Sequence, residues 1–287
     1  MLRKTIGSAN KMKTIGFVMH FGKDATSSYV TEILRGVLAG LKETRYNIRL
    51  ISHEQFSKIG NSFERSGIDG VIITHGSRDI PDNLRYQIEK SEEKTWPIVV
   101  INDYNPNLDM NQLYTNSYNA SYNLASYLVK KGCREFYLIG ADGKSNDALK
   151  RKKAFKDALL ERGIRLAKEK FIEGFFSEKG GCAAVKKALK NDPSFNGAFF
   201  CLNDAMAIGA ILAISQSGLN CPRDVKVTGF DDVPQAAFTN PPLTTMKFPL
   251  AGMGQEAVRI IDAILRKKLN RHTTRQFDAS LVVRNSC

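Results

Sequence analysis

Short apolar runs alternate with longer amphipathic segments along most of the chain. Residues 14–20 form a β-branched and aromatic run, and residues 29–42 follow with apolar side chains at helical spacing. This spacing predicts a strand and then a helix. Further strands are expected at 48–51, 70–74, 98–101, 136–140, 170–173, 197–201 and 225–229, and further helices around 84–89, 120–130, 150–162, 182–189 and 205–217. Because the strands are apolar nearly throughout, they predict parallel sheets covered by helices on both faces.

The two halves of this series follow one plan. Residues 66–74 and 193–201 each place a turn and a glycine before an apolar strand, and no Gly/Ser-rich linker separates the halves. We therefore expect the α/β fold class, with two doubly wound parallel-sheet subdomains. A long amphipathic helix at 250–269 and a last strand-like run at 280–284 close the chain. Crossings between the halves are expected near 115–117 and 243–245.

Composition narrows the class of protein. The chain has 287 residues, 43% of them hydrophobic, and a net charge of +13. This length allows two domains of about 140 residues. No run of about 18 uncharged apolar residues could cross a membrane. The basic N-terminus lacks the apolar region of a signal peptide, so we expect a cytoplasmic protein. Basic clusters would attract nucleic acid without reading its sequence, because no DNA-reading motif accompanies them.

Polar residues gather after the expected strands, where the loops of a parallel sheet form a ligand crevice. These loops carry His20, His75, Asn102, Asp103, residues 142–147 including Asp147, Phe175, Phe176, Asn203, Asp204, Asp231 and Asp232. Each residue alone has an ordinary explanation as a turn former or a helix cap. Together, amides, carboxylates, an arginine and aromatic rings suit a polyhydroxylated small molecule.

Enzymatic and metal-binding motifs find little support. Gly143-Lys144-Ser145 lacks the first glycine of a P-loop, because Leu138 stands there. No nucleophile elbow or metalloprotease motif occurs, and the histidines are dispersed. The five cysteines are odd in number and contain no CxxC pair, which favours reduced thiols. Asp204, Asp231 and Asp232 are better explained as caps and hydroxyl acceptors than as cation ligands. We expect no enzyme, no cofactor and no metal.

A long combined pattern then resembles one protein family, the LacI/GalR bacterial transcription regulators. It consists of Asn203-Asp204-Ala205-Met206-Ala207-Ile208-Gly209-Ala210, the run from Gly218 to Val225 with Cys221-Pro222-Arg223-Asp224, Gly229-Phe230-Asp231-Asp232, Pro241-Pro242-Leu243-Thr244-Thr245, Pro249, Met253-Gly254, Ala257 and Leu281-Val282-Val283-Arg284. Thr14-Ile15-Gly16 and Arg35-Gly36 also fit. The resemblance spans roughly residues 13–287 and is specific only as a whole.

The resemblance implies a periplasmic-binding-protein-like type I fold with three crossovers. Its subdomains would comprise 13–116 with 243–272 and 117–242 with 273–287, after a hinge or linker remnant at 1–12. A small-molecule effector would bind in the cleft and change the subdomain angle. The effector contacts carried over by motif position are Tyr29, Asn102, Asp103, Arg151, Phe176, Asn203 and Asp231, and Asp147 is added from the strand-end pattern.

Roles within this set follow from the side-chain chemistry. Asp231 and Arg151 would hold sugar-type hydroxyls, while Tyr29 and Phe176 cover the ring, unless these two are plain core aromatics. We expect Arg151→Ala to abolish effector binding with little loss of stability. A purine or nucleoside effector stays open, because both rings could also stack a base.

Two departures from the family pattern concern ligand and DNA. Residues 20–28 replace the usual Asp-x-x-Asn-Pro loop, and Ala154 replaces a glycine, which leaves the effector's identity open. The family's N-terminal helix-turn-helix is absent, so operator DNA would be bound only through that missing domain. We expect a homodimer that acts as a transcriptional repressor. A solute-binding protein of a sugar uptake system is the alternative, and an enzyme acting on a sugar or nucleoside is a third.

Overall fold

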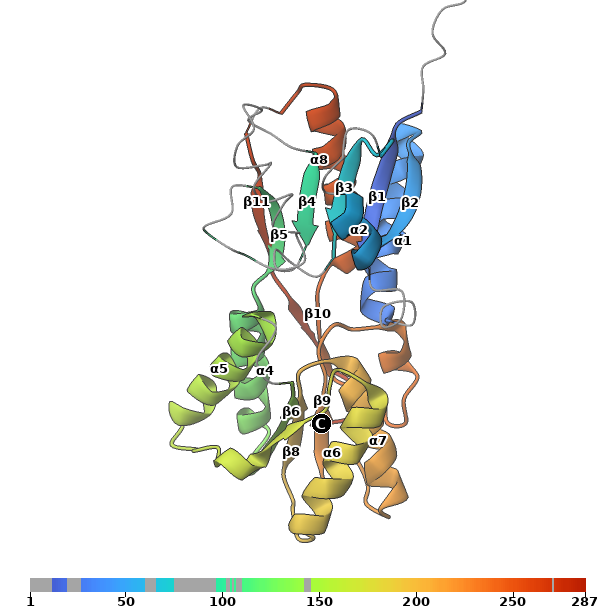
Figure 1. The fold of residues 1–287 in the computed structure, drawn as a ribbon. Coiled ribbons are helices and arrows are strands. Elements are labelled where there is room, and N and C mark those ends of the chain that lie inside the picture. The colour runs from blue at the N-terminus through green and yellow to red at the C-terminus, as the bar shows by residue number, and fades with distance from the viewer. Residues whose placement is uncertain are drawn as a thin grey trace, which may run out of the picture. The chain divides into compact units, whose positions relative to one another are not determined.

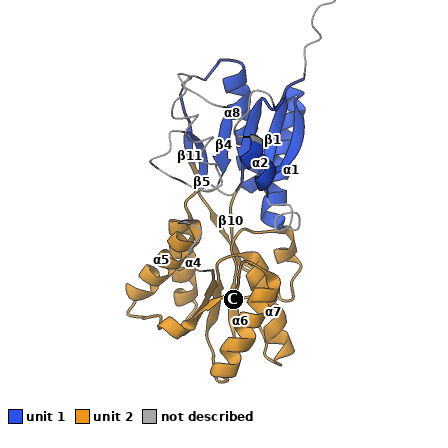
Figure 2. Ribbon diagram, in the orientation of Figure 1, with its two compact units in different colours: residues 1–114, 250–275 blue, residues 115–249, 276–287 orange. Residues whose placement is uncertain are grey.

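The computed structural model describes residues 12–19, 27–59, 66–74, 97–101, 104, 106, 110–141, 146–269 and 271–287. The chain forms two compact units, residues 1–114 with 250–275 and residues 115–249 with 276–287 (Figure 2). Strands alternate with helices in both (Figure 1). The expected α/β class with parallel sheets in two subdomains is confirmed. No helix in these described ranges is long and apolar enough to cross a membrane.

Unit 1 is built on a six-stranded sheet with the order β11-β5-β4-β3-β1-β2. The strands are β1 (Thr14–Met19), β2 (Asn47–Ser52), β3 (Gly70–Ile73), β4 (Ile98–Ile101), β5 (Asn111–Thr115) and β11 (Thr274–Phe277). The pairs β1–β2, β1–β3, β3–β4 and β4–β5 are parallel. β3 and β4 are buried throughout, as their continuous apolar sequences predict.

Three helices accompany this sheet: α1 (Ser28–Thr44), α2 (His53–Ile59) and α8 (Leu250–Leu265). Helix α8 packs against α1 and also contacts β3 and β4. The last helix of the expected series thus returns to the first unit. The helix expected around 84–89 lies outside the described residues.

Unit 2 holds a four-stranded parallel sheet with the order β7-β6-β8-β9. Its strands are β6 (Phe136–Gly140), β7 (Phe171–Glu173), β8 (Ala198–Cys201) and β9 (Lys226–Thr228). Its helices are α4 (Ser117–Lys130), α5 (Asn146–Leu160), α6 (Glu178–Asn191) and α7 (Asp204–Gln216), with short 3-10 turns η3 (Lys168–Lys170) and η4 (Pro234–Ala237). Helix α4 packs against α5, and α6 against α7.

A separate two-stranded antiparallel sheet joins β10 (Thr245–Lys247) to β12 (Ser280–Val282). Residues 115–116 and 243–249 belong to unit 2 and residues 273–275 to unit 1, whereas the sequence interpretation grouped each of them with the other subdomain. Backbone hydrogen bonds hold residues 243–249 beside the chain that follows β9. The Gly229 and Asp231 N–H groups donate to the Thr244 and Met246 carbonyls at 3.0 and 2.7 Å.

Aromatic side chains form part of the core of unit 2 and fix α5 on the sheet. Phe155 of α5 lies 4.3 Å from Phe200 and 5.7 Å from Phe136, measured between ring centroids. All three side chains are buried. Residues four apart on a helix share one face, so this contact also turns the side chain at position 151 toward the sheet.

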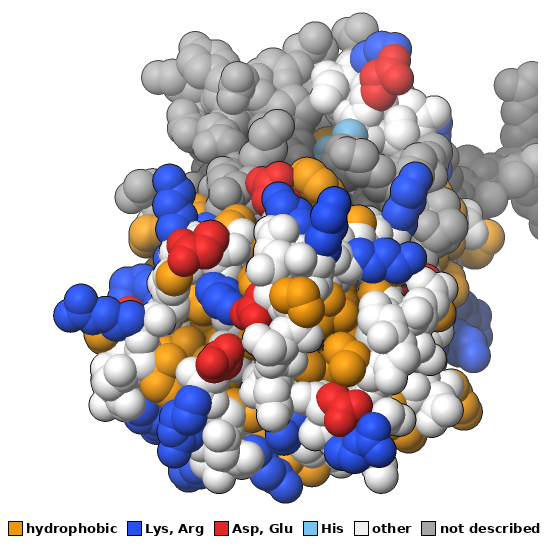
Figure 3. Space-filling model, turned by 90° about the horizontal axis from the view of Figure 1, so that it is seen from below, with side chains coloured by type: hydrophobic (Ala, Val, Ile, Leu, Met, Phe, Trp, Pro, Cys, Tyr) orange, Lys and Arg blue, Asp and Glu red, His pale blue; other side chains and the backbone are white. Residues whose placement is uncertain are grey.

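The surface of unit 2 is charged with both signs. Lysine and arginine side chains in Figure 3 are interspersed with aspartate, glutamate and apolar side chains. The basic side chain of Lys153 on α5 is exposed and paired with Asp157 at 2.5 Å. The basic cluster in this helix is therefore divided between a solvated face and the buried Arg151.

Candidate functional site

The carboxyl ends of the four parallel strands of unit 2 lead to five of the expected site residues. The segment after β6 reaches Asp147 and Arg151 on α5, β7 leads to Phe176, β8 to Asn203 and β9 to Asp231. Because the strands are parallel, these segments leave from the same edge of the sheet.

Arg151 makes several contacts at this edge, and its side chain is only 7% exposed. Its Nη2 lies 2.6 Å from Asp147 Oδ2, one helical turn earlier. Its Nη1 donates a hydrogen bond of 2.6 Å to the carbonyl of Leu202 and lies 3.6 Å from Asp231 Oδ1. The structure thus brings Asp147, Arg151 and Asp231 together from two separate segments.

The position of Arg151 is set by its surroundings on several sides. Its guanidinium carbon lies 4.0 Å from the centroid of the Phe230 ring and 5.8 Å from that of Phe248. Such stacking favours a cation that burial would otherwise disfavour. On α4, the Ser121 hydroxyl donates to the Arg151 carbonyl at 2.8 Å. Arg151 is therefore held as a rigid part of the site.

Asp231 occupies an unusual turn directly after β9. Its φ is 113° and that of Asp232 is 56°, conformations that side-chain-bearing residues rarely adopt. Asp231 is buried, yet Oδ1 accepts no hydrogen bond from the part of the chain that the structure describes, and the same holds for Arg151 Nε as a donor. One buried acceptor and one buried donor are therefore left without a hydrogen bond.

Burial also changes the acidity of this carboxyl. It raises the pKa of Asp231 to about 7; the charge of Arg151 opposes this rise, and the charge of Asp147 adds to it. The 3.6 Å ion pair with Arg151 is too long to compensate fully for the lost hydration. Asp231 can thus accept or release a proton near neutral pH.

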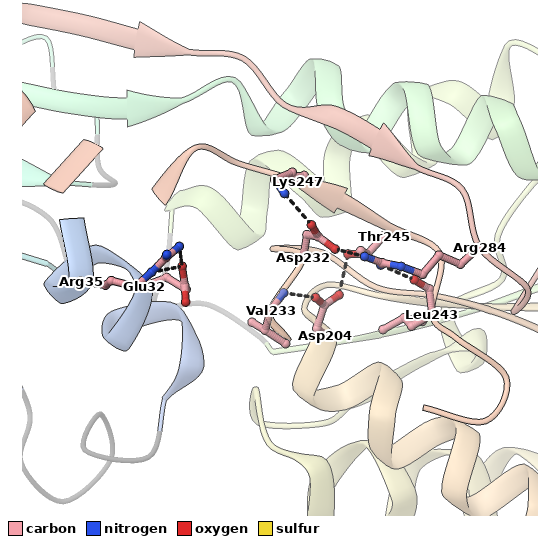
Figure 4. A network of polar contacts seen from close by, with 9 residues as sticks. All are labelled: Glu32, Arg35, Asp204, Asp232, Val233, Leu243, Thr245, Lys247 and Arg284. Atoms are coloured by element: carbon pink, nitrogen blue, oxygen red, sulfur yellow. Dashed lines mark hydrogen bonds and ion pairs between the residues drawn. The ribbon is translucent and has the colours of Figure 1, made fainter. Parts of the chain in front are cut away.

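A second buried carboxyl, Asp204, supports the same turn from the start of α7. Its Oδ2 accepts the Val233 N–H at 2.9 Å, and its Oδ1 accepts the Thr245 hydroxyl at 2.6 Å (Figure 4). Burial is the main cause that raises the pKa of Asp204 well above its usual range, and the nearby charge of Asp231 adds to it. The two hydrogen bonds have the opposite effect. Asp204 therefore links α7, the Asp231 turn and β10.

Asn203 and Phe176 lie next to each other at the ends of β8 and β7. Asn203 caps α7 by accepting the Met206 N–H at 3.0 Å, and its Nδ2 donates to the Phe176 carbonyl at 3.3 Å. Phe175 and Phe176 both have φ of 52°, with exposures of 69% and 40%. Phe176 is therefore not a plain core aromatic, and its ring is accessible.

The remaining expected residues are less informative. Tyr29 lies half-buried in the first turn of α1, in unit 1. Asn102 and Asp103 fall outside the described residues. Within the described ranges, no group of three or more His, Cys, Asp or Glu side chains is arranged to hold a metal ion.

Sequence reasoning missed the supporting residues of the site. Phe230 and Phe248 stack with Arg151, and Arg284 and Lys247 pair with Asp232 at 2.6 and 3.2 Å. Phe230, Asp232 and Arg284 belong to the segments that carried the family resemblance, so that pattern had already marked these positions. It gave no indication of which residues meet.

Comparison with known proteins identifies the family. A family profile described as "Periplasmic binding protein-like domain" matches residues 125–287. The "HTH-type transcriptional repressor PurR" of Histophilus somni is 27% identical over 281 residues, which covers 96% of this chain and 82% of the relative. The "Ribose operon repressor" of Haemophilus influenzae is 26% identical over 279 residues, covering 96% and 81%.

A solved structure agrees with the fold. It is described as "transcriptional regulator CelR-cellobiose complex" and matches with a TM-score of 0.84 at 21% identity, over 96% of this chain and 85% of that one. The named relatives are repressors, which favours a regulator over a solute-binding protein. Together with the family profile, these matches show that the chain belongs to the periplasmic binding protein-like domain family and is the effector-binding core of a LacI/GalR-type transcription regulator.

Proposed function

We propose that this core senses a small, uncharged, polyhydroxylated ring compound of the sugar type. The observation that carries the proposal is that two neighbouring side chains each keep a buried group without a hydrogen bond, Asp231 Oδ1 as an acceptor and Arg151 Nε as a donor. A hydroxyl can donate to the first and accept from the second, whereas an apolar ligand would leave both groups without a hydrogen bond. The exposed Phe176 ring offers an apolar face for the ring carbons.

The charge balance disfavours an anionic effector. Arg151 is already paired with Asp147 and approached by Asp231, so two carboxylates face one guanidinium. A phosphate or carboxylate ligand would bring a further negative charge to a guanidinium that Asp147 already pairs, and leaving that charge uncompensated is costly in a buried site. A neutral sugar avoids this cost. The solved relative CelR binds cellobiose, and another relative is named for ribose. Both sugars belong to the class of ligand that we propose for this chain.

We further propose that this core works as a homodimer in the cytoplasm. Binding of the effector would control how a helix-turn-helix domain, of the kind that the relatives' names specify, binds operator DNA. Leu212 of α7 and Phe238 after η4 support the dimer, because these large apolar side chains are 53% and 87% exposed in unit 2. A dimer contact would remove them from water.

Thermal unfolding with a ligand panel tests the proposed effector. Neutral mono- and disaccharides, sugar phosphates, nucleosides and purines are each added to the purified chain. A ligand at about 100 times its dissociation constant stabilises the folded state by about 2.7 kcal/mol and raises the midpoint by several degrees. We expect this shift with a neutral sugar, its loss in Asp231→Asn, and its retention in Asp192→Asn, which breaks the remote Lys170 pair.

The other outcomes contradict the proposal in distinct ways. Stabilisation by sugar phosphates alone would refute the charge argument. Stabilisation by purines or nucleosides alone would favour the base-stacking alternative. No shift with any compound on folded protein would refute the proposed class of effector altogether.

A further inference from the structure

The turn at Asp231 and Asp232 needs external support to keep its shape. Two consecutive residues with φ of 113° and 56° are unfavourable for amino acids with side chains. Such backbone conformations persist only where the surrounding structure holds them. The contacts that hold this turn therefore also decide where the Asp231 carboxylate lies.

Besides the hydrogen bond that Asp204 accepts from the Val233 N–H, these contacts come from β10 and from the segment after β12. The Asp231 N–H donates to the Met246 carbonyl at 2.7 Å. The Asp232 carboxylate, 7% exposed, lies 2.6 Å from Arg284 Nη2 and 3.2 Å from Lys247 Nζ (Figure 4). Asp232 thus connects the turn to β10 and to the segment that follows β12.

Arg284 is itself anchored. Its Nη1 donates to the Leu243 carbonyl at 2.8 Å, and its backbone N–H donates to the Thr244 hydroxyl at 2.9 Å. The charged groups facing Asp231 come from other elements, with Arg151 and Asp147 on α5 and Asp204 on α7. The Asp232 carboxylate pairs with Arg284 and Lys247. Asp232 therefore affects Asp231 through the backbone of the turn and not through a direct side-chain contact.

We propose that Asp232 is a positioning residue, which clamps the turn to β10 and Arg284 and so keeps the Asp231 carboxylate buried beside Arg151. The effector consequence rests on the proposed function, because Asp231 is the residue expected to bind hydroxyls. Loss of the clamp lets the turn relax and water reach Asp231. β10 ends at Lys247 and α8 of unit 1 begins at Leu250, so the clamp acts on the chain segment that leads into unit 1.

The direction in which the pKa of Asp231 shifts distinguishes a positioning role of Asp232 from a simple change of nearby charge. The side-chain carboxyl of Asp231 is followed by carbon-13 NMR against pH and assigned with Asp231→Asn. The variants are Asp232→Asn, Lys247→Met and Arg284→Gln. Asparagine is chosen at position 232 because it tolerates the left-handed backbone there. Hydration of Asp231 lowers its pKa in all three variants. Charge alone would raise the pKa in Lys247→Met and Arg284→Gln, since each removes a nearby cation.

We expect the Asp231 midpoint to fall from about 7 in all three variants. The fall should reach about one pH unit in Asp232→Asn, with a smaller fall in Lys247→Met. Lys247 is 58% exposed, so its variant is expected to fold even if Arg284→Gln does not. Asp192→Asn removes a remote carboxylate and should leave the midpoint unchanged.

A rise or no change in Lys247→Met would overturn the inference. This failure is distinguishable from failure of the proposed function. If Asp231→Asn loses neutral-sugar stabilisation but the clamp variants do not lower the Asp231 midpoint, the function stands and the clamp is wrong. If the midpoint falls as expected but Asp231→Asn responds to sugars like the unmodified chain, the clamp stands and the effector role of Asp231 is wrong.

Discussion

Asp231 illustrates how burial at one residue links binding to pH. Its pKa of about 7 in the folded chain lies above the ordinary value of 3.8. Between these two values the folded chain keeps a proton that the unfolded chain has released. The contribution of Asp231 to the free energy of unfolding is therefore largest at low pH and falls as pH rises toward 7.

Asp231→Asn tests this linkage, because asparagine cannot ionise. The stability of the unmodified chain relative to the variant should fall between pH 4 and 7, by at most about 4 kcal/mol. Urea unfolding at pH 5 and pH 8 measures the difference. In Asp192→Asn the difference should hardly change between pH 5 and pH 8, because the hydrogen bond from Lys170 lowers the pKa of Asp192 and its contribution is lost only as pH falls below about 4. A pH-independent difference for Asp231→Asn would contradict the buried carboxyl.

At Arg151, the structure changes an expectation drawn from sequence. We expected Arg151→Ala to cost little stability, but the side chain is buried between two carboxylates and stacked on Phe230. Removing one partner of a buried charge pair leaves the other uncompensated. The expected loss is about 3–5 kcal/mol of unfolding free energy at pH 8. It should be smaller at pH 5, where Asp231 is protonated.

Urea unfolding of Arg151→Ala measures this loss, and Lys153→Ala is the matched control on the same helix. Lys153 is exposed, pairs with Asp157 at the surface and lies 5.5 Å from the centroid of the Tyr118 ring. Its loss should cost about 1 kcal/mol or less. Equal effects of the two substitutions would refute the buried role of Arg151.

At the scale of elements, close contact between α6 and α7 sets the start of α7, where Asn203 and Asp204 lie. A Cβ on Gly209 would come 1.9 Å from the Glu178 carbonyl oxygen, and one on Gly181 would come 2.1 Å from that of Met206. Both clashes involve backbone, which cannot move aside as a flexible side chain can. The two helices therefore require glycine at these crossings.

Gly209→Ala is expected to destabilise the chain by about 1–3 kcal/mol through overpacking. Helix propensity alone would give a gain of about 1 kcal/mol. Ser215→Ala, at an exposed position of α7, should change stability by about 0.5 kcal/mol or less. Denaturant unfolding of the two variants decides, and stabilisation by Gly209→Ala would show that the helices can separate without cost.

The elements themselves were largely predictable, because hydrophobic periodicity is a local property. The strand expected at 136–140 is β6, and the helix expected at 205–217 is α7 at Asp204–Gln216. β10 was not expected as a strand. It has three residues and exists through pairing with β12, far along the chain, which no local pattern indicates.

At the scale of the whole molecule, each unit is assembled from separate parts of the chain. Helix α8 returns to unit 1, where its buried face packs on α1 and contacts β3 and β4. β10 and β12 stay with unit 2. Apolar side chains left outside both cores, such as Phe238 at 87% exposure, are available for contact with another chain.

Phe238→Asp tests the proposed dimer by placing a charge in the expected contact. A buried charge without a partner is costly, so the variant should weaken dimerisation at least about tenfold. Sedimentation equilibrium over a range of protein concentrations measures the change. Leu160→Asp, an exposed apolar residue at the end of α5, serves as the control and should leave the association unchanged. A dimer unaffected by Phe238→Asp would exclude this face.

The sequence by itself determined the α/β class, the parallel sheets and the strand ends at which polar residues gather, because periodicity and turn residues are local. Its family pattern also indicated Arg151, Asn203 and Asp231. Only the tertiary structure decided that Arg151 pairs with Asp147, that Asp231 keeps an unbonded buried oxygen, and that Asp232 connects to Arg284. Burial and pairing depend on segments distant in sequence, and no local pattern records which of them meet.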